Sequence, residues 1–409
     1  MSAFLLRPAR VWSDGATHEG WSVLVRGERI AAVGAKIEAG DAEVVDLSGL
    51  TLLPGLMDLH SHLFLHPYNE TPWDDQVLKE SEAYRTVRAV RHAEATLRAG
   101  FTTLRDLGAE GAGYADVAIK RAIEEGVIPG PRLFVVTRAI VATGSYGPAR
   151  AKFRPDCCIP QGAQEASGVD EVVRAVRHQA SHGADWIKVY ADYRAGPAGE
   201  TVATFSIDEL KALVETSHSL GRPVAAHATS NEGMRRAALA GVDTIEHGYG
   251  GARQTFALMK KNDIAYLPTL TVCEALCEYF HGHTRGGEPH PRMQDAANAF
   301  RSARAEGVTI GCGSDVGPFP HGENLRELQW MEKLGMSAND ALLAATSVNA
   351  TIIRRERELG GVKPGHLADL IAAEGDPSRD LGALAHISFV MKNGSRFRPT
   401  APIASPKAT

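Results

Sequence analysis

Short apolar segments alternate with longer amphipathic segments eight times between Gly55 and Gly365, and this alternation constrains the fold more than any other feature. Each apolar segment has the length of a buried strand, and a helical pattern follows nearly every one. The expected strands are residues 56–60, 102–106, 132–136, 186–190, 224–227, 244–247, 264–269 and 308–313. Eight strand–helix units within about 310 residues predict an α/β fold of the (β/α)8 TIM barrel type. A doubly wound sheet is the alternative arrangement.

The helices expected between these strands occupy residues 80–98, 114–125, 169–182, 207–220, 231–240, 292–306 and 338–350. The two ends of the chain differ from this middle part, because both contain short β-branched runs separated by turns. Asn393-Gly394 is a hairpin turn signal near the far end. We therefore expect a small β-sandwich-like satellite domain from residues 1–54 and 366–398, a barrel from residues 55–365, and a disordered tail at 399–409.

The charge balance excludes several classes of partner. The chain has 44 Lys and Arg against 49 Asp and Glu, a formal net charge of −5, which provides no basic field for a nucleic acid. No apolar run reaches the roughly 18–20 residues of a membrane span, and the start has no signal-peptide pattern. The five cysteines suggest no disulfide framework. We expect a cytoplasmic enzyme with a small-molecule substrate and no nucleic-acid or membrane partner.

Side chains that bind metals follow several of the expected strands, at the ends where barrel enzymes have their active sites. Residues two apart in an extended segment point the same way, so His60 and His62 are able to reach one ion. The full set of candidates is His60, His62, Lys188, His227, His247 and Asp315. Imidazole together with carboxylate suits zinc or another first-row divalent ion. Taken alone, Asp315 is equally well explained as a turn or helix cap.

Lys188 stands inside an apolar strand, Asp185-Trp-Ile-Lys-Val-Tyr190. Burial lowers the pKa of a lysine, and a neutral amine reacts with carbon dioxide to give a carbamate that is able to bridge two cations. An interior lysine held by an ion pair is the alternative explanation.

Several sequence motifs resemble the binuclear amidohydrolase superfamily, specifically its imidazolonepropionase-like and Xaa-Pro dipeptidase branch. The motifs are Leu53-Pro-Gly-Leu-Met-Asp-Leu-His-Ser-His62, Gly100-Phe-Thr-Thr-Leu-Arg-Asp106, Ala184-Asp-Trp-Ile-Lys188, Val224-Ala-Ala-His-Ala228, Gly241-Val-Asp-Thr-Ile-Glu-His-Gly248, Gly311-Cys-Gly-Ser-Asp315, His321-Gly-Glu-Asn-Leu-Arg-Glu-Leu328 and Gly365-His-Leu-Ala-Asp-Leu370. They cover almost the whole chain in family order. Imidazolonepropionase itself is disfavoured, because the resemblance gives that enzyme a mononuclear site without a bridging lysine, whereas Lys188 is present in this chain.

The resemblance implies two divalent metal ions, with zinc as the default. By this resemblance His60 and His62 bind the first ion with Asp315, N-carboxylated Lys188 bridges, and His227 and His247 bind the second. A hydroxide shared by the two cations is the implied nucleophile. Asp315 and His247 are the expected catalytic residues, Asp315 acting as general base and then as general acid.

Loop residues give the candidates for substrate binding, because barrel specificity comes from the loops after the strands. The candidates are Tyr146, Tyr190, Arg194, His283, Arg285 and His321. Tyr146 stands in Thr143-Gly-Ser-Tyr146, where relatives often have Thr-Gly-Gly-His. The segment 270–290 is the longest insertion and a candidate lid. An arginine in these loops suits a substrate carboxylate.

These features together predict a metal-dependent amidohydrolase that cleaves an amide or peptide bond next to a free carboxylate. Xaa-Pro dipeptides, N-acyl amino acids and aryl-acyl amino acids of the ochratoxin type are the candidate substrates. A lactone, a cyclic amide or a carbamate remains an alternative with the same metal centre. A non-catalytic assembly protein on this fold is disfavoured, because all six ligand positions are intact. We also expect a homo-oligomer.

Overall fold

The computed structural model describes residues 2–398, and the predicted tail at 399–409 lies outside the described residues. Packing divides the chain into two compact units. The first contains the residues up to Met57, Thr96–Thr102 and the residues from Met336 onward, and the second contains Asp58–Ala95 and Thr103–Gly335. Residues 336–365, which we assigned to the barrel, therefore pack with the chain ends. The domain boundaries drawn from the sequence stay a prediction.

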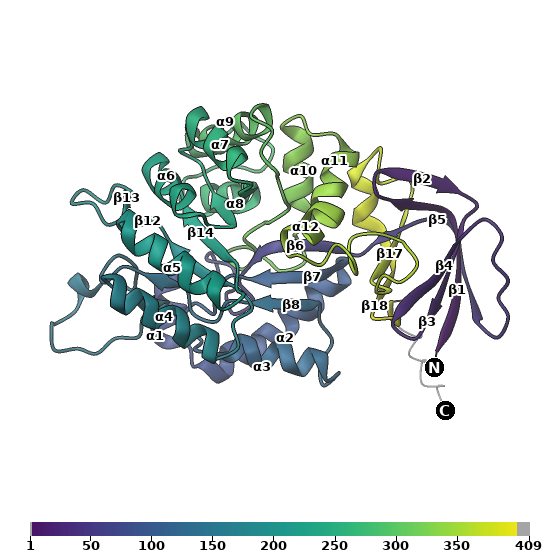
Figure 1. Ribbon diagram of the computed structural model, residues 1–409, viewed down its shortest axis with the longest axis horizontal. Coiled ribbons are helices and arrows are strands. Elements are labelled where there is room, and N and C mark those ends of the chain that lie inside the picture. Colours follow the sequence, from purple (N-terminus) through teal and green to yellow (C-terminus); the bar gives the residue numbers. More distant parts are fainter. Residues whose placement is uncertain (1, 399–409) are drawn as a thin grey trace. The chain divides into compact units, whose positions relative to one another are not determined.

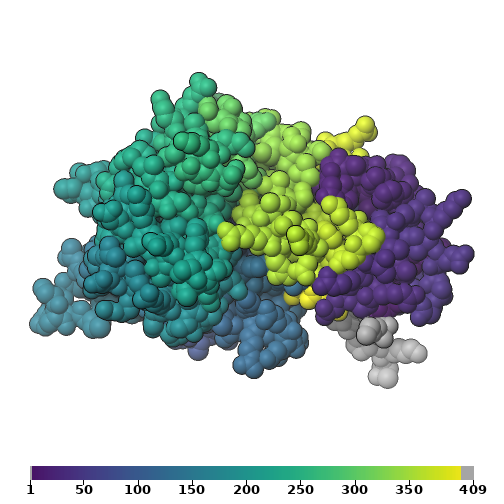
Figure 2. All heavy atoms as spheres, viewed as in Figure 1, coloured from purple at the N-terminus to yellow at the C-terminus, as the bar shows by residue number. Residues whose placement is uncertain are grey.

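Strands from both chain ends form one eight-stranded sheet in the first unit, in the order β19-β18-β17-β5-β1-β3-β4 with β2 on β1. Its strands are β1 (Ala3–Ser13), β2 (Ala16–Glu19), β3 (Ser22–Arg26), β4 (Arg29–Gly34), β5 (Glu43–Pro54), β17 (Leu370–Glu374), β18 (Ile387–Lys392) and β19 (Ser395–Arg398). Purple N-terminal and yellow C-terminal strands lie together in the ribbon and adjoin on the surface (Figures 1 and 2). The unit is thus β-rich, with one continuous sheet where we expected a sandwich-like pair.

Alternating side chains of this sheet form its hydrophobic core. Phe4 and Leu6 of β1 share one cluster with Phe389 and Met391 of β18. Residues two apart on a strand face the same way, so Phe4 with Leu6, and Phe389 with Met391, each lie on one face of the sheet. This period-2 pattern explains why the two chain ends were recognisable as strands.

Parallel strands form two sheets in the second part of the fold. One has the order β6 (Leu56–Ser61), β7 (Phe101–Asp106), β8 (Arg132–Val135). The other has the order β10 (Gln164–Glu165), β9 (Ile140–Val141), β11 (Ile187–Tyr190), β14 (Val224–Ala228), β15 (Thr244–His247), β16 (Ala265–Leu267). A short antiparallel pair, β12 (Asp192–Tyr193) and β13 (Val202–Ala203), follows β11. Figure 1 shows the parallel strands with helices on both sides, as the α/β prediction requires.

Backbone hydrogen bonds connect the two sheets at two places. The Asp185 amide donates to the Val135 carbonyl at 2.8 Å, which joins β8 to the start of β11. At the second place, parallel bridges link Tyr266 to Ile310 and Ser61 to Val316. The segment 308–316 therefore lies between β16 and β6. It is extended but not a regular strand, so the eighth expected strand is present only as isolated bridges.

The helices carry clear local signals at several ends. They are α1 (Trp73–Lys79), α2 (Glu82–Arg98), α3 (Ala115–Glu124), α4 (Val169–Ser181), α5 (Ile207–Ser219), α6 (Asn231–Ala240), α7 (Arg253–Lys261), α8 (Leu270–Phe280), α9 (Pro291–Ala305), α10 (Leu325–Lys333), α11 (Ala338–Leu343) and α12 (Asn349–Ile352). Ser206 and Glu209 form a capping box at α5, and α6 ends at the left-handed Gly241. The sequence analysis did not specify α1, α7, α8 and α10. Among the described residues, no helix is long and apolar enough to cross a membrane.

Segment 270–290, the candidate lid, begins with α8. Residues Leu270–Ala275 of this helix are all buried. The first half of the segment is therefore part of the packed interior, because seven of its helical side chains are removed from solvent. Only the part after Phe280 has the exposure expected of a surface loop.

Candidate active site

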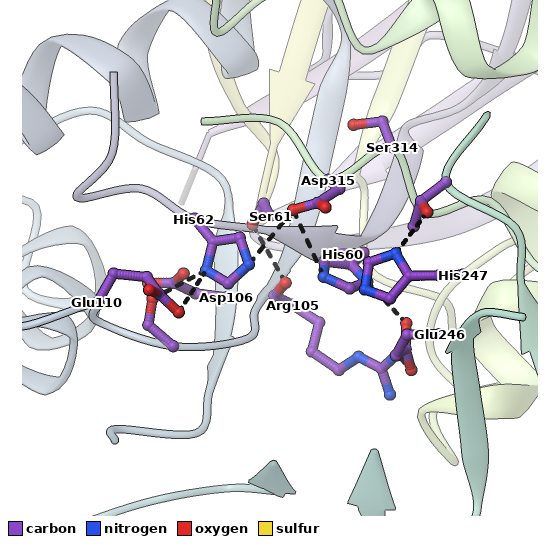
Figure 3. Close-up of polar contacts among 12 residues, drawn as sticks. His60, Ser61, His62, Arg105, Asp106, Glu110, Glu246, His247, Ser314 and Asp315 are labelled. Atoms are coloured by element: carbon purple, nitrogen blue, oxygen red, sulfur yellow. Dashed lines mark hydrogen bonds and ion pairs between the residues drawn. The ribbon is translucent and has the colours of Figure 1, made fainter. Parts of the chain in front are cut away.

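Three predicted metal ligands meet at the carboxyl end of β6. The Nε2 atoms of His60 and His62 lie 3.5 and 3.3 Å from Oδ1 of Asp315. One ligand atom from each of the three residues lies within 4.8 Å of the others, which is the spacing of a metal site (Figure 3). The Asp315 amide donates to the His60 carbonyl at 2.7 Å, so the backbone itself places this carboxylate against β6.

Buried side chains fix the orientation of His60. Its Nδ1 lies 2.9 Å from Oε2 of Glu246, so Nε2 faces Asp315. Arg105 donates to Oε1 of Glu246 at 2.9 Å and to the Leu59 carbonyl at 2.7 Å. Arg105 and Glu246 are both fully buried. A second partner of this kind sets the tautomer and the direction of a metal-binding histidine.

His62 is held from the side opposite Asp315. Its Nδ1 lies 3.0 Å from the Gly108 carbonyl and 4.0 Å from Oε1 of Glu110. Burial alone would lower the pKa of His62, but Asp315, Glu110 and Asp106 outweigh burial and raise it to about 9. The negative charge that holds a proton on this ring is equally suited to hold a metal cation nearby.

Lys188 is 1% exposed, and its Nζ has no hydrogen-bond partner among the described residues. Burial lowers its pKa to about 8. An unpartnered buried amine is costly as an ammonium, so burial favours its neutral form. In the register of β11 and β14, Lys188 pairs with Ala225 and Tyr190 pairs with His227. Lys188 therefore lies two residues before the position opposite His227.

His227 and His247 complete the set of histidines. Their ring centroids lie 4.4 Å apart, and those of His247 and His60 lie 5.0 Å apart. Burial is the main cause that lowers the pKa of His227 and of His247. Neutral rings present a lone pair, which is the form that binds metal. The structure thus brings His60, His62 and Asp315 together at metal-site spacing, and the rings of His227 and His247 lie beside them on β14 and β15.

Left-handed backbone at strand ends aims two of these side chains. His247 and Asp315 have φ of 70° and 61°, and Thr269 has φ of 49°. Glu246 already points into the interior, so the next residue of a regular strand would point away from it. The turn of the backbone at His247 reverses that direction. Non-glycine residues in this region are uncommon and cluster at functional sites.

The hydroxyl of Thr269 holds His247, with 2.8 Å between Oγ1 and Nδ1. Thr269 is the N-cap residue of α8 but makes no side-chain cap bond. Glu327 from α10 caps the helix instead, because its carboxylate accepts from the Leu270 amide at 2.9 Å and the Thr271 amide at 2.8 Å. Because Glu327 supplies the cap, the Thr269 hydroxyl is available to orient His247.

A cavity of about 780 Å³ opens above the six ligands. Five of them line it, as do three of the predicted substrate contacts, Tyr146, Tyr190 and Arg194. The remaining wall includes Tyr68, Tyr193, Tyr249, Leu276 and residues of α9. Its volume is in the range of small-molecule sites.

The other three predicted substrate contacts do not line this cavity. Arg285 is bound by Glu278 at 3.1 Å and Glu323 at 3.5 Å, so its charge is already paired. The rings of His321 and His92 stack with centroids 4.2 Å apart. His283 lies 3.9 Å from Glu274, a residue of buried α8. Their positions in loops suggested contact with substrate, but tertiary packing directs them elsewhere.

The sequence analysis missed several cavity residues, among them the charged residues Glu110 and Arg292. Glu110 follows β7 in the loop where Gly108 binds His62, and Arg292 begins α9. A carboxylate just beyond a strand end was a usable signal for Glu110, since strand ends carry the other site residues. The position of Arg292 had no such signal, because it depends on how α9 packs.

Comparisons with known proteins identify relatives of this chain. The sequence profile of the amidohydrolase family matches residues 51–396. Ochratoxinase from Aspergillus niger is 30% identical over 373 residues, which cover 85% of this chain and 75% of that protein. The crystal structure of a Xaa-Pro dipeptidase with bound methionine in its active site has a TM-score of 0.86 and 30% identity, covering 97% of this chain and 100% of that one. A prolidase complexed with N-methylphosphonate-L-proline has a TM-score of 0.82 and 27% identity, covering 97% and 100%.

Replacing Glu246 with Gln tests the support of His60. The variant leaves Arg105 buried without its carboxylate, so we expect the free energy of unfolding to fall by about 3–5 kcal/mol. Metal affinity should fall about 10–100-fold, because His60 loses the partner that sets its ring. Denaturant unfolding and metal content measure the two effects. Glu125→Gln, which disrupts an exposed pair with Arg121, is the control and should change stability by about 0.5 kcal/mol or less. An equal effect of both variants would contradict this role.

Glu327 should make stability depend on pH. Burial is the largest influence and raises its pKa from an ordinary 4.5 to about 8, despite the hydrogen bonds from Leu270 and Thr271. The folded state therefore holds this proton more tightly than the unfolded state. Its contribution is complete below pH 4.5 and is lost as the pH rises through 8. We expect the difference in unfolding free energy between wild type and Glu327→Gln to fall across this window, and a flat difference would show that Glu327 titrates normally.

Proposed function

Because this chain belongs to the amidohydrolase family and is a hydrolase that acts on carbon–nitrogen bonds, we propose that it is a binuclear metal-dependent enzyme that hydrolyses an amide or peptide bond next to a free carboxylate. One observation carries the proposal. His60, His62 and Asp315 converge at the floor of a cavity that also contains His227 and His247. Such a set has no explanation in packing alone.

The residues present fit two divalent cations. His60, His62 and Asp315 would hold one and His227 with His247 the other, while the unpartnered Nζ of Lys188 suits a carbamate bridge. We propose zinc, since imidazole and carboxylate ligands suit it. Cations bound there would supply Lewis-acid activation of water and of the scissile carbonyl.

Asp315 is the proposed proton carrier of the reaction. Its carboxylate accepts a proton from the attacking water and then donates it to the leaving nitrogen, so that the carbon–nitrogen bond breaks with a neutral amine as product. Its left-handed backbone and the bond from its amide to His60 keep it at the strand end, facing the cavity.

Two arginines support a free carboxylate in the substrate. Arg194 and Arg292 both line the cavity and are exposed, and neither is ion-paired with a carboxylate among the described residues. A guanidinium binds a carboxylate through two parallel hydrogen bonds. The methionine and the N-methylphosphonate-L-proline bound to the two related enzymes also carry a carboxylate.

We also propose that the two parallel sheets close into a TIM barrel, supported by the bond from Asp185 to Val135 and by the bridges from residues 308–316 to β16 and β6. The small β-rich domain belongs to the same architecture. Self-association, a cytoplasmic location and the lack of a nucleic-acid or membrane partner stay predictions from the sequence.

The function is tested by amino acid release from Xaa-Pro dipeptides and N-acyl amino acids. We expect zinc-loaded protein to release the carboxylate-bearing product, a chelator to abolish release and added zinc to restore it. Asp315→Asn should lower kcat by about 10²–10⁴-fold, the usual contribution of a general acid–base group. The proposed substrate class would be wrong if the metal-loaded enzyme released no product from this panel but hydrolysed lactones, cyclic amides or carbamates.

Replacement of Lys188 with Ala tests the carbamate bridge. We expect bound metal and activity to be lost together, because the variant removes the only side chain that would contact both cations. Lys120→Ala is the control, since Lys120 of α3 forms an ion pair with Asp185 at 2.7 Å and does not line the cavity. Metal analysis and turnover provide the measurements. If Lys188→Ala keeps two metals per chain, the bridge has to be abandoned.

Arg194→Met and Arg292→Met test recognition of the carboxylate. We expect kcat/KM to fall about 10–100-fold for substrates with a free carboxylate, as for other lost hydrogen bonds to a charged group. The same substrates capped as carboxamides should be little affected. Arg285→Met is the matched control, because Arg285 lies outside the cavity and is already paired. If kcat/KM fell more in Arg285→Met than in the other two variants, the carboxylate contact would have to be assigned to the loop that contains Arg285.

A further inference from the structure

Glu110 is a buried carboxylate on the cavity wall, and the proposed reaction does not use it. The residue is 2% exposed, yet it is part of the cavity lining. No Lys or Arg of the described residues forms an ion pair with its carboxylate. Arg85 donates to the backbone carbonyl of Glu110 at 2.6 Å, so this cation holds the chain and not the acid.

Neutral donors fix the Glu110 side chain. Trp73 Nε1 donates to Oε2 at 3.0 Å and the Tyr146 hydroxyl donates to the same atom at 2.8 Å. The Tyr190 hydroxyl lies 3.4 Å from the other oxygen, Oε1. These bonds orient the carboxylate without neutralising it. The left-handed backbone of Glu110, with φ of 47°, is a further sign that the position is constrained.

The location of Glu110 separates it from the catalytic carboxylate. In Figure 3, Glu110 and Asp315 lie on opposite sides of the His62 ring. Their distances from this ring are 4.0 Å to Nδ1 for Glu110 and 3.3 Å to Nε2 for Asp315. A substrate group that reaches Glu110 is therefore beside the metal ligands but not on the path of the proton that Asp315 carries.

Aromatic rings surround this part of the cavity. The centroids of Tyr190 and Tyr193 both lie 4.8 Å from that of Tyr146, and all three side chains line the cavity. Aromatic faces attract ammonium groups, most strongly where water is excluded. A fixed carboxylate among tyrosines is thus a suitable site for an organic cation and a poor one for an acyl chain or a second anion.

We propose that Glu110 binds an ammonium group on the acyl side of the substrate, so that the substrates are zwitterionic dipeptides and not N-acyl amino acids. The proposal rests on the proposed function, because Arg194 and Arg292 bind the carboxylate at the other end of the same molecule. Opposite charges on the cavity wall then fix the direction in which a dipeptide binds. This separates two substrate classes that the metal centre alone treats alike.

A positioning role for Glu110 would have a different signature. A carboxylate 4.0 Å from Nδ1 of His62 is able to support that ligand, and its removal would then lower bound metal. Loss of metal would affect every substrate equally. Loss of ammonium binding affects only substrates that carry a free amine.

The test compares L-alanyl-L-proline with N-acetyl-L-alanyl-L-proline, which share the scissile bond and the carboxylate. We expect wild type to prefer the free amine. Glu110→Gln, which keeps an acceptor for Trp73 and Tyr146, should lower kcat/KM for the free dipeptide about 10–100-fold while leaving the acetylated one and the metal content unchanged. Glu110→Asp keeps the charge and should retain part of the preference. Glu232→Gln removes a carboxylate that is paired with two arginines outside this cavity, and it should change neither substrate.

Several results would overturn the proposal. These are equal losses on both peptides, reduced metal in Glu110→Gln, or a wild-type enzyme that does not prefer the free amine. The last comparison needs no variant, so it decides even if Glu110→Gln fails to fold. If wild type cleaves neither peptide, the proposed function has failed, and calorimetric Kd values then test Glu110 separately. Tighter binding of the free amine that Glu110→Gln weakens supports the site, whereas equal binding or no binding of either peptide refutes it.

Discussion

The buried contact between Arg105 and Glu246 is the interaction on which the site depends. It joins β7 to β15 across the interior of the strands, and the same carboxylate accepts from Nδ1 of His60. Two opposite charges are tolerated there because each satisfies the other and both make further hydrogen bonds. One ion pair therefore holds two strands together and turns a metal-binding nitrogen toward Asp315.

The side chains in the second half of the site are oriented by left-handed backbone and by the hydrogen bonds of Thr269 and Glu327. His247 and Asp315 reach the cavity only because their backbones turn into the left-handed region at the strand ends. The Thr269 hydroxyl is able to bind His247 because the Glu327 carboxylate, and not Thr269, accepts the hydrogen bonds of the first amides of α8. The ligands are thus fixed by groups that never contact the cavity. Charged groups add to the lining, since Arg194, Arg292 and the Glu110 carboxylate all border the cavity.

Much of the metal site was predictable from the sequence, and the reason is local. Residues at the ends of parallel strands necessarily meet at one face, so strand prediction alone brings His60, His62, His227 and His247 together. Substrate contacts had no such rule. Tyr146, Tyr190 and Arg194 line the cavity as expected, whereas His283, Arg285 and His321 form other contacts because loops pack by tertiary complementarity.

The sequence by itself determined the alternation of strands and helices, the β-rich chain ends and the candidate metal ligands. Each of these features depends on hydrophobic periodicity and residue spacing over a short stretch of sequence. Only the tertiary structure decided which charges are paired. Arg105 and Glu246 are 141 positions apart, and Arg292 reaches the cavity from α9. Such pairings depend on distances through space, and a single sequence carries no record of them. For the same reason the unpaired charges, from which the substrate was inferred, became visible only when the fold showed which groups had no partner.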